Sequence, residues 1–115
     1  MMKKILPLAV LALAGCATLQ LPADRLQSSE ASIRSAEELG ASNVPAARLH
    51  LQLAKDETLA AKKLAAEGDE RAELVLARAE ADAELALGLA RQVAVHSEAV
   101  RADEDLKAVR ARSAN

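Results

Sequence analysis

One cysteine and two histidines carry the most distinctive side-chain chemistry in this sequence. Cys16 stands alone, so no disulfide can close within the chain and its thiol must serve another purpose. Catalysis or zinc binding would need Cys, His, Asp or Glu side chains that converge on one point. Neither His50 nor His96 has such neighbours at ligand spacing. We therefore expect no catalytic residue and no metal ligand, and we expect His50 at the border of a helix face.

Carboxylates occur in short runs, for example Glu37-Glu38 and Asp103-Glu104-Asp105. Adjacent side chains on a helix point about 100° apart and do not converge, so these runs are typical of solvated helix surface. The sequence has no glycine-rich loop for phosphate and no aromatic ring to stack on a base or a sugar. We expect no enzyme activity, no small-molecule substrate and no cofactor apart from a covalent lipid.

The N-terminal 15 residues have the layout of an export signal. Lys3 and Lys4 precede an apolar run over residues 5–14, which is shorter than the roughly 20 residues that span a bilayer. Without residues 1–15 the charges are 13 basic and 17 acidic, because Lys3 and Lys4 are lost from totals of 15 and 17. This acidic balance argues against nucleic-acid binding. The run ends in four consecutive residues, Leu13, Ala14, Gly15 and Cys16.

These four residues resemble the lipobox of bacterial lipoprotein precursors. The resemblance implies that the Cys16 thiol receives a diacylglycerol and that its new amino group receives a third acyl chain. Several acyl chains anchor a protein stably, whereas one holds it only marginally. The alternative is that Cys16 is an ordinary small core residue. Ala17 stands where an Asp favours retention in the inner membrane, so the expected location is the outer membrane, facing the periplasm.

The remaining chain reads as three helices, because 25 of its 100 residues are alanine, the best helix former. We expect the first helix from an N-cap at Asp24 to Leu39, and the second from a cap at Ser42 or Asn43 to Glu67. The third begins near Glu70 behind an Asp69 N-cap. The predicted fold is all-α, an antiparallel helical hairpin or three-helix bundle with an extended C-terminal helix.

Each helix carries a face of small and apolar residues at alternating steps of three and four, the spacing of a buried seam. In the first helix these are Leu26, Ser29, Ile33, Ala36 and Gly40. In the second they are Ala47, Leu51, Ala54, Thr58, Ala61 and Ala65, with Leu49, Leu53, Ala60 and Leu64 expected to widen the face. In the third they are Ala72, Leu76, Ala79, Ala83, Ala86, Ala90 and Val93. Such small side chains bury little area each, so the core is modest and gains from a second copy, a partner or the membrane.

The turns and seams resemble a family of short bacterial lipoproteins, the domain-of-unknown-function 4398 family. The matching positions are Gly40-Ala41 before Pro45, then Ala54, Ala61, Gly68-Asp69, Ala72, Ala79 and Asp82-Ala83. They fall between Leu26 and Ala90, which is most of the chain after the signal. The resemblance implies a lipid anchor, an alanine-rich helical hairpin and a location in the cell envelope. It implies no activity, because the family has none assigned.

The C-terminal segment extends beyond the end of the predicted hairpin. We divide the chain into a signal peptide (1–15), a lipidated linker (16–23), a helical domain (24–94) and a charged helical extension (95–115). The extension carries a seam without an intrachain partner, or else it is a frayed and solvated tail. We predict that this seam is the docking surface for a partner, formed by Val95, Ala99, Ala102, Leu106 and Val109.

These patterns favour a membrane-anchored envelope lipoprotein with a structural or protein-interaction role. The expected partners are the membrane, through the lipid, and either another envelope protein or a second copy of the chain. The alternative is a self-associating coiled-coil lipoprotein that gives mechanical support to the envelope.

Overall fold

The computed structural model describes residues 18–114, and the regular elements among them are all helical. Helix α1 spans Ala23–Glu38, the 3-10 turn η1 spans Ala41–Asn43, α2 spans Pro45–Ala66 and α3 spans Arg71–Ser113. The predicted all-α hairpin with an extended C-terminal helix is confirmed. The predicted signal peptide and the lipobox residues Leu13, Ala14, Gly15 and Cys16 lie outside the described residues.

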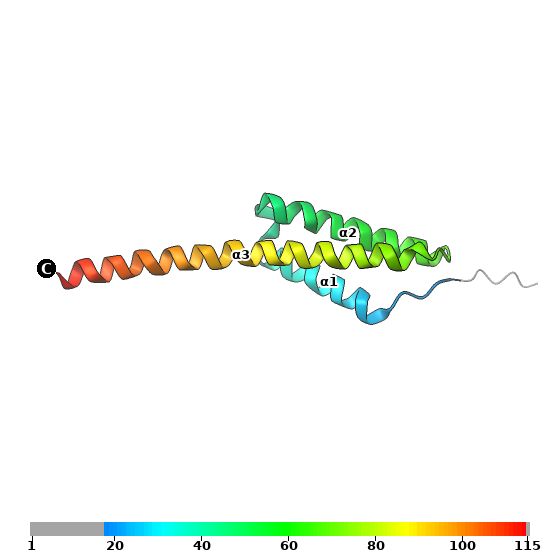
Figure 1. The fold of residues 1–115 in the computed structure, drawn as a ribbon, viewed down its shortest axis with the longest axis horizontal. Coiled ribbons are helices and arrows are strands. Elements are labelled where there is room, and N and C mark those ends of the chain that lie inside the picture. Colours follow the sequence, from blue (N-terminus) through cyan, green and yellow to red (C-terminus); the bar gives the residue numbers. More distant parts are fainter. Residues whose placement is uncertain (1–17, 115) are drawn as a thin grey trace, which may run out of the picture.

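Helix α3 is the central element of the molecule. Figure 1 shows α2 along one side of it and α1 along the other, and α1 and α2 contact each other less than each contacts α3. The segment before α1 and the turn between α2 and α3 lie at one end. From residue 94 onward α3 runs past the other end of the hairpin, and we call residues 94–113 the overhang. The remainder, residues 18–93, is the body.

The core of the body consists mainly of alanine. All six residues predicted as the main face of α2 are buried, and so are the first six predicted for α3. Ser29, Ile33 and Ala36 supply the buried face of α1, while Leu26 is only half-buried. Alanine side chains allow closely packed helices, and Leu76 is the largest side chain that is fully enclosed. The seam predictions for the three helices are therefore largely confirmed.

The prediction that Leu49, Leu53, Ala60 and Val93 face the core is wrong. Ala60 is exposed. Leu49 is 58% exposed, Leu53 is 37% exposed and Val93 is 49% exposed. Leu49 follows the buried Ala47 by two residues, which is about 200° around a helix, so its side chain leaves the seam instead of widening it. Val93 lies at the end of the body, where the covering helices have stopped.

Both interhelical turns use glycine in the left-handed region. Gly40 has φ 77° and Gly68 has φ 73°, values that a side chain disfavours. After Gly68, one carboxylate oxygen of Asp69 accepts a hydrogen bond from the backbone N–H of Arg71 at 2.9 Å, and the Arg71 guanidinium holds the same carboxyl group. These bonds lower the pKa of Asp69 to about 2. Asp69 thus fixes the start of α3, although the N-cap position itself is Glu70.

The predicted N-caps of the first two helices are wrong. The N-cap of α1 is Pro22 and that of α2 is Val44, and neither side chain can accept a capping hydrogen bond. Asp24 lies in the first turn of α1, where its negative charge still favours the helix dipole. Ser42 and Asn43 belong to η1, which separates α1 from α2.

Candidate functional site

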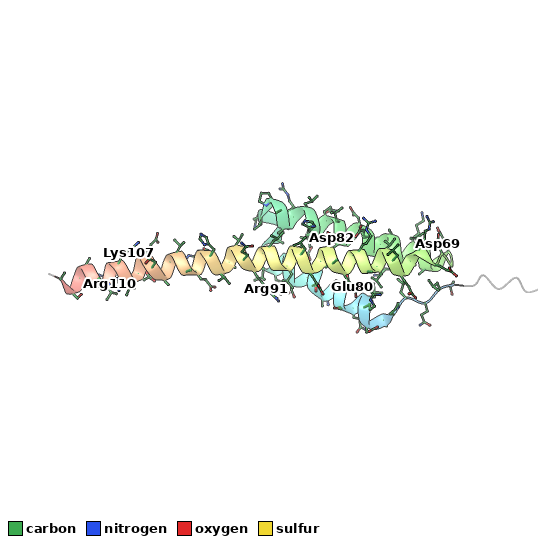
Figure 2. All side chains as sticks on the ribbon, in the orientation of Figure 1. Asp69, Glu80, Asp82, Arg91, Lys107 and Arg110 are labelled. Carbon is green, nitrogen blue, oxygen red and sulfur yellow. The ribbon has the colours of Figure 1, made fainter. Side chains whose placement is uncertain are left out.

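The overhang is the part of α3 that extends beyond α1 and α2 (Figure 1). Every residue from Glu98 to Ala114 is exposed, and the helix nevertheless continues without a break to Ser113 (Figure 2). The structure therefore shows a helix here and not a frayed tail. All five residues predicted for docking are exposed together: Val95, Ala99, Ala102, Leu106 and Val109.

These five residues are one part of a longer stripe. The steps of three and four continue toward the N-terminus of α3 through Gln92, Gly88 and Leu85, which are also exposed. Sequence reasoning missed these positions because the body of α3 was read only for its buried seam. We call the full set the outer stripe: Leu85, Gly88, Gln92, Val95, Ala99, Ala102, Leu106 and Val109.

The outer stripe lies on the opposite side of α3 from the core. Ala99 follows the buried Ala90 by nine residues, and nine steps of about 100° place the two about 180° apart. The α1 and α2 helices cover the Ala90 side, so they leave the outer stripe open along both the body and the overhang. Seven of its eight members are apolar or glycine, and Gln92 is the exception.

Charged residues border the outer stripe along one edge. They recur every seven residues, each is exposed, and none is in an ion pair within residues 18–114: Glu84, Arg91, Glu98, Asp105 and Arg112. By contrast, Lys107 on another side of the helix already pairs with Asp103 at 2.6 Å. The edge charges are therefore available to a partner.

A second group of polar residues joins α2 to α3 inside the body. His50 Nδ1 lies 2.6 Å from a carboxylate oxygen of Asp82, and Arg78 lies 2.8 Å from one carboxylate oxygen of Glu57. The other oxygen of Glu57 is buried without a hydrogen-bond partner. Burial raises the pKa of Glu57, and Arg78 opposes the rise while Asp82 adds to it. The prediction that His50 borders a helix face fits its half-buried position.

Ion pairs and one buried hydroxyl contact hold α1 in place. Glu37 pairs with Lys55, Glu30 pairs with Lys62 at 2.6 Å, and Arg25 pairs with Glu80 of α3. Beneath them the hydroxyls of Ser29 and Thr58 lie 3.4 Å apart, and Thr58 donates to the backbone of Ala54 at 2.7 Å. These pairs explain the polar residues of the α1–α2 border as structural contacts.

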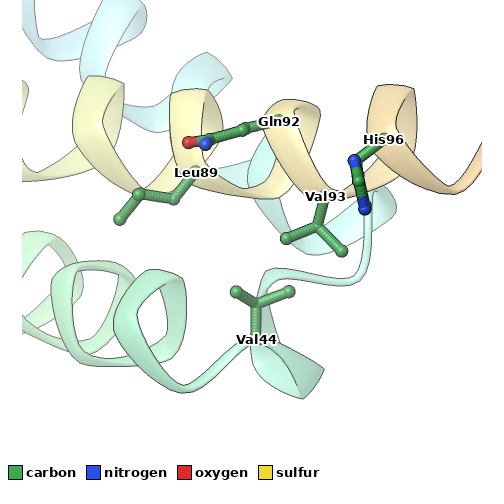
Figure 3. Close-up of a pocket in the computed structure, with 5 residues that line it drawn as sticks. All are labelled: Val44, Leu89, Gln92, Val93 and His96. Carbon is green, nitrogen blue, oxygen red and sulfur yellow. The ribbon is translucent and has the colours of Figure 1, made fainter. Parts of the chain in front are cut away.

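His96 lies at an open pocket of about 400 Å³ where the overhang leaves the body (Figure 3). The other lining residues are Val44, Leu89, Gln92 and Val93. Only Gln92 and His96 among these five offer polar side-chain atoms, and Figure 3 shows His96 at the edge next to Val93. The pocket is a mostly apolar notch without converging catalytic groups.

Two further features of residues 18–114 bear on function. No group of three or more His, Cys, Asp or Glu side chains is placed to hold a metal ion in this part of the chain. Among the same residues no helix is long and apolar enough to cross a membrane.

No protein-family model, curated protein or solved structure matches this chain. The resemblance to the 4398 family stays a prediction from the sequence. The candidate site is therefore defined by geometry, as the outer stripe with its charged edge.

Proposed function

We propose that the protein is a membrane-anchored lipoprotein of the cell envelope, acylated at Cys16, that binds a protein partner through α3. The proposed location is the periplasmic face of the outer membrane. Its proposed role is structural, as an interaction module without catalysis. The sequence around Cys16 supports the anchor, and the exposure of the outer stripe supports the interaction role.

The uncovered overhang is the observation that carries the interaction role. A single helix in water is marginal unless its apolar face is packed, and shorter helices are the least stable. The overhang repeats Val, Leu and Ala at seam spacing along a face that no other segment of residues 18–114 covers. A partner helix that packs on this face would both stabilise the overhang and remove its apolar side chains from water.

The position of the overhang suits a protein anchored at its N-terminus. The backbone N–H of Leu19 donates to the carbonyl of Ala65 at 2.9 Å, so the chain just after Cys16 is held at the end where α2 meets α3. Helix α3 starts at that end and has 43 residues. At about 1.5 Å per residue its tip lies about 65 Å away. An anchor at Cys16 therefore favours presentation of the overhang away from the membrane.

The anchor is tested by Cys16→Ser in the producing bacterium. We expect an uncleaved precursor that takes up no radiolabelled palmitate, while the parent chain is cleaved, labelled and recovered with the outer membrane after density separation. Ser42→Cys, at an exposed position of η1, is the matched control that leaves the lipobox intact. Normal cleavage and labelling of Cys16→Ser would refute the anchor.

The interaction role is tested by removing residues 95–115 from the anchored protein. We expect the shortened chain to remain in the membrane but to lose the chemical cross-links that the full chain forms in intact cells. Leu106→Glu should weaken the same cross-links, and Val100→Glu, which changes an exposed valine away from the stripe, should leave them unchanged. Identical cross-linking of all four chains would place the partner surface elsewhere.

The second candidate function is a self-associating coiled-coil lipoprotein that stiffens the envelope. The observation that favours it is the seven-residue repeat of the outer stripe, which extends over more than three heptads. A ladder of cross-linked products at multiples of the chain mass separates this candidate from binding to a different envelope protein.

A further inference from the structure

We infer that the outer stripe binds the outer stripe of a second copy of this chain, with the two α3 helices antiparallel. In this arrangement Leu85 of each copy lies opposite Val109 of the other. The inference rests on the proposed interaction role of α3, and it names the partner and its orientation. Size, charge and the free space around one glycine support it.

Residue size along the stripe fits an antiparallel pair. With Leu85 opposite Val109, Gly88 lies opposite Leu106, Gln92 opposite Ala102, and Val95 opposite Ala99. After the first pair, each larger residue therefore meets a small one. A parallel pair would instead place Gly88 against Gly88 and Leu106 against Leu106, which leaves gaps at some levels and crowding at others.

Packing among residues 18–114 does not explain why position 88 is a glycine. Gly88 lies in the interior of α3, where glycine costs about 1 kcal/mol relative to alanine. Apart from its chain neighbours and the nearby backbone of its own helix, a Cβ atom built on Gly88 would meet no atom within 4 Å. Packing inside one copy therefore does not require glycine here, whereas Leu106 of a second copy would need the space.

Charge at the edge of the stripe selects the same orientation and register. In the antiparallel pair the edges of the two stripes run side by side, so Glu84 meets Arg112 and Arg91 meets Asp105, each twice by symmetry. Only Glu98 meets a like charge, its own counterpart. Shifting the pair by one heptad in either direction would place Asp105 opposite Glu84 or Glu98. Exposed pairs add little affinity each, but they determine orientation and register.

The parallel alternative is less complementary. In a parallel coiled coil each edge residue faces the residue five positions later on the other helix. Glu98 would then face Asp103 and Arg91 would face His96, and only the pair of Asp105 with Arg110 would attract. The antiparallel pair has four attractive contacts at this edge and one repulsive contact.

The outer stripe is exposed over its whole length. The α1 and α2 helices pack on the Ala90 side of α3, about 180° around the helix from Ala99. Each overhang then lies along the α3 body segment of the other copy. The stretch from Leu85 to Val109 gives about 37 Å of paired helix on each chain at about 1.5 Å per residue.

The decisive experiment introduces one cysteine per chain, in addition to Cys16, and uses the mature protein extracted from membranes in mild detergent. Leu85→Cys and Val109→Cys chains carry tags of different mass and are oxidised separately and as a mixture. We expect a disulfide-linked pair of the two different chains in the mixture, and little product from either chain alone. Cross-linking of Val109→Cys with itself at high yield would show a parallel pair and overturn the inference.

The parent chain serves as the control for the anchor. Its only cysteine is Cys16, so a maleimide that labels the parent would show a free thiol and contradict acylation. That result is independent of the cross-linking result at positions 85 and 109. If all chains stay monomeric in sedimentation while Cys16 is acylated, the second copy is the wrong partner and the proposed anchor is untouched.

Charge reversal tests the register. Arg91→Glu should weaken the pair by about tenfold, and combining it with Asp105→Arg should restore the pair, because the two attractive contacts are re-formed with their signs exchanged. Arg101→Glu, at an exposed position away from the stripe, is the matched control and should have little effect. Failure of the double variant to recover would overturn this register.

Replacement of Gly88 tests the size argument. Gly88→Leu should fold normally, because the added atoms meet open space within the chain, but it should abolish pairing. Ala108→Leu, at an exposed position outside the stripe, should pair as the parent does. Sedimentation showing equal dimerisation of both variants would contradict the close contact at Gly88.

Discussion

The body and the overhang are built from similar residues, yet the chain itself buries only one of them. Both regions repeat small and apolar side chains at steps of three and four. In the body, α1 and α2 cover that repeat, and alanines such as Ala79 and Ala83 have no exposed surface. In the overhang, Val95 and Val109 are each more than half exposed. A heptad repeat thus predicts that a helix face can pack, while only the fold shows whether its partner belongs to the same chain.

The largest expected effect comes from placing a charge in the body. Ala79→Glu should lower the free energy of unfolding by about 3 kcal/mol, because the new carboxylate is both too large and unpaired in a sealed seam. Ala108→Glu, in the overhang, should change it by less than about 0.5 kcal/mol, as surface changes usually do. Thermal melts followed by circular dichroism measure both. Equal melting temperatures would mean that the body is not packed as described.

Substitution of Glu57 is expected to raise the free energy of unfolding, by less than Ala79→Glu lowers it. The raised pKa of Glu57 means that the folded body favours the protonated carboxyl, so this stabilisation is present below the ordinary glutamate pKa and is lost as pH rises through the folded value. At pH 7 the buried carboxylate oxygen is a cost. Glu57→Gln should therefore stabilise the body at pH 7 by on the order of 1 kcal/mol.

Glu57→Gln should also remove the part of the pH dependence of stability that comes from protonation of Glu57. Urea unfolding of parent and variant between pH 4 and pH 8 measures the difference, which should widen as pH rises. Asp56→Asn, at the exposed neighbouring position, is the control for loss of one negative charge. A variant that is less stable than the parent at pH 7 would show that the ion pair with Arg78 outweighs the cost of burial.

Effects of that size or smaller are expected at the histidines, where the two regions again differ. His50→Ala removes the contact with Asp82 and should cost about 1 kcal/mol. His96→Ala should cost almost nothing, because its exposed imidazole has no polar partner among the described side chains. Urea unfolding measures the loss of stability in both variants, as a lower midpoint with an unchanged slope of free energy against urea concentration. Loss of envelope function in either variant without loss of stability would indicate a binding site at that histidine.

The sequence predicted those features that depend on spacing along one helix. The buried faces of α2 and α3 follow from steps of three and four, and the glycine turns follow from the need for positive φ at Gly40 and Gly68. Contacts between helices were harder to predict. The pairs of Lys55 and Lys62 with α1 depend on how the helices cross, which spacing along one helix does not show.

Helix starts and the extent of the outer stripe were predicted less well. Asp24 was chosen as a cap by residue type, but the path of the chain makes Pro22 the first capping position. The stripe was found only from Val95 onward, because in the body two seams share one helix and the buried seam accounted for its apolar residues. The acylation of Cys16 stays a prediction, since the structure describes residues 18–114.

Hydrogen exchange across α3 tests most directly whether the body is held by its own core and the overhang by association. We expect the amides of residues 72–90 to exchange slowly at every protein concentration. Those of residues 98–112 should exchange rapidly in the dilute acylated protein and become protected as concentration rises. The Gly88→Leu variant should keep the overhang amides in rapid exchange at all concentrations. An overhang that stays unprotected in the concentrated parent protein would contradict the account.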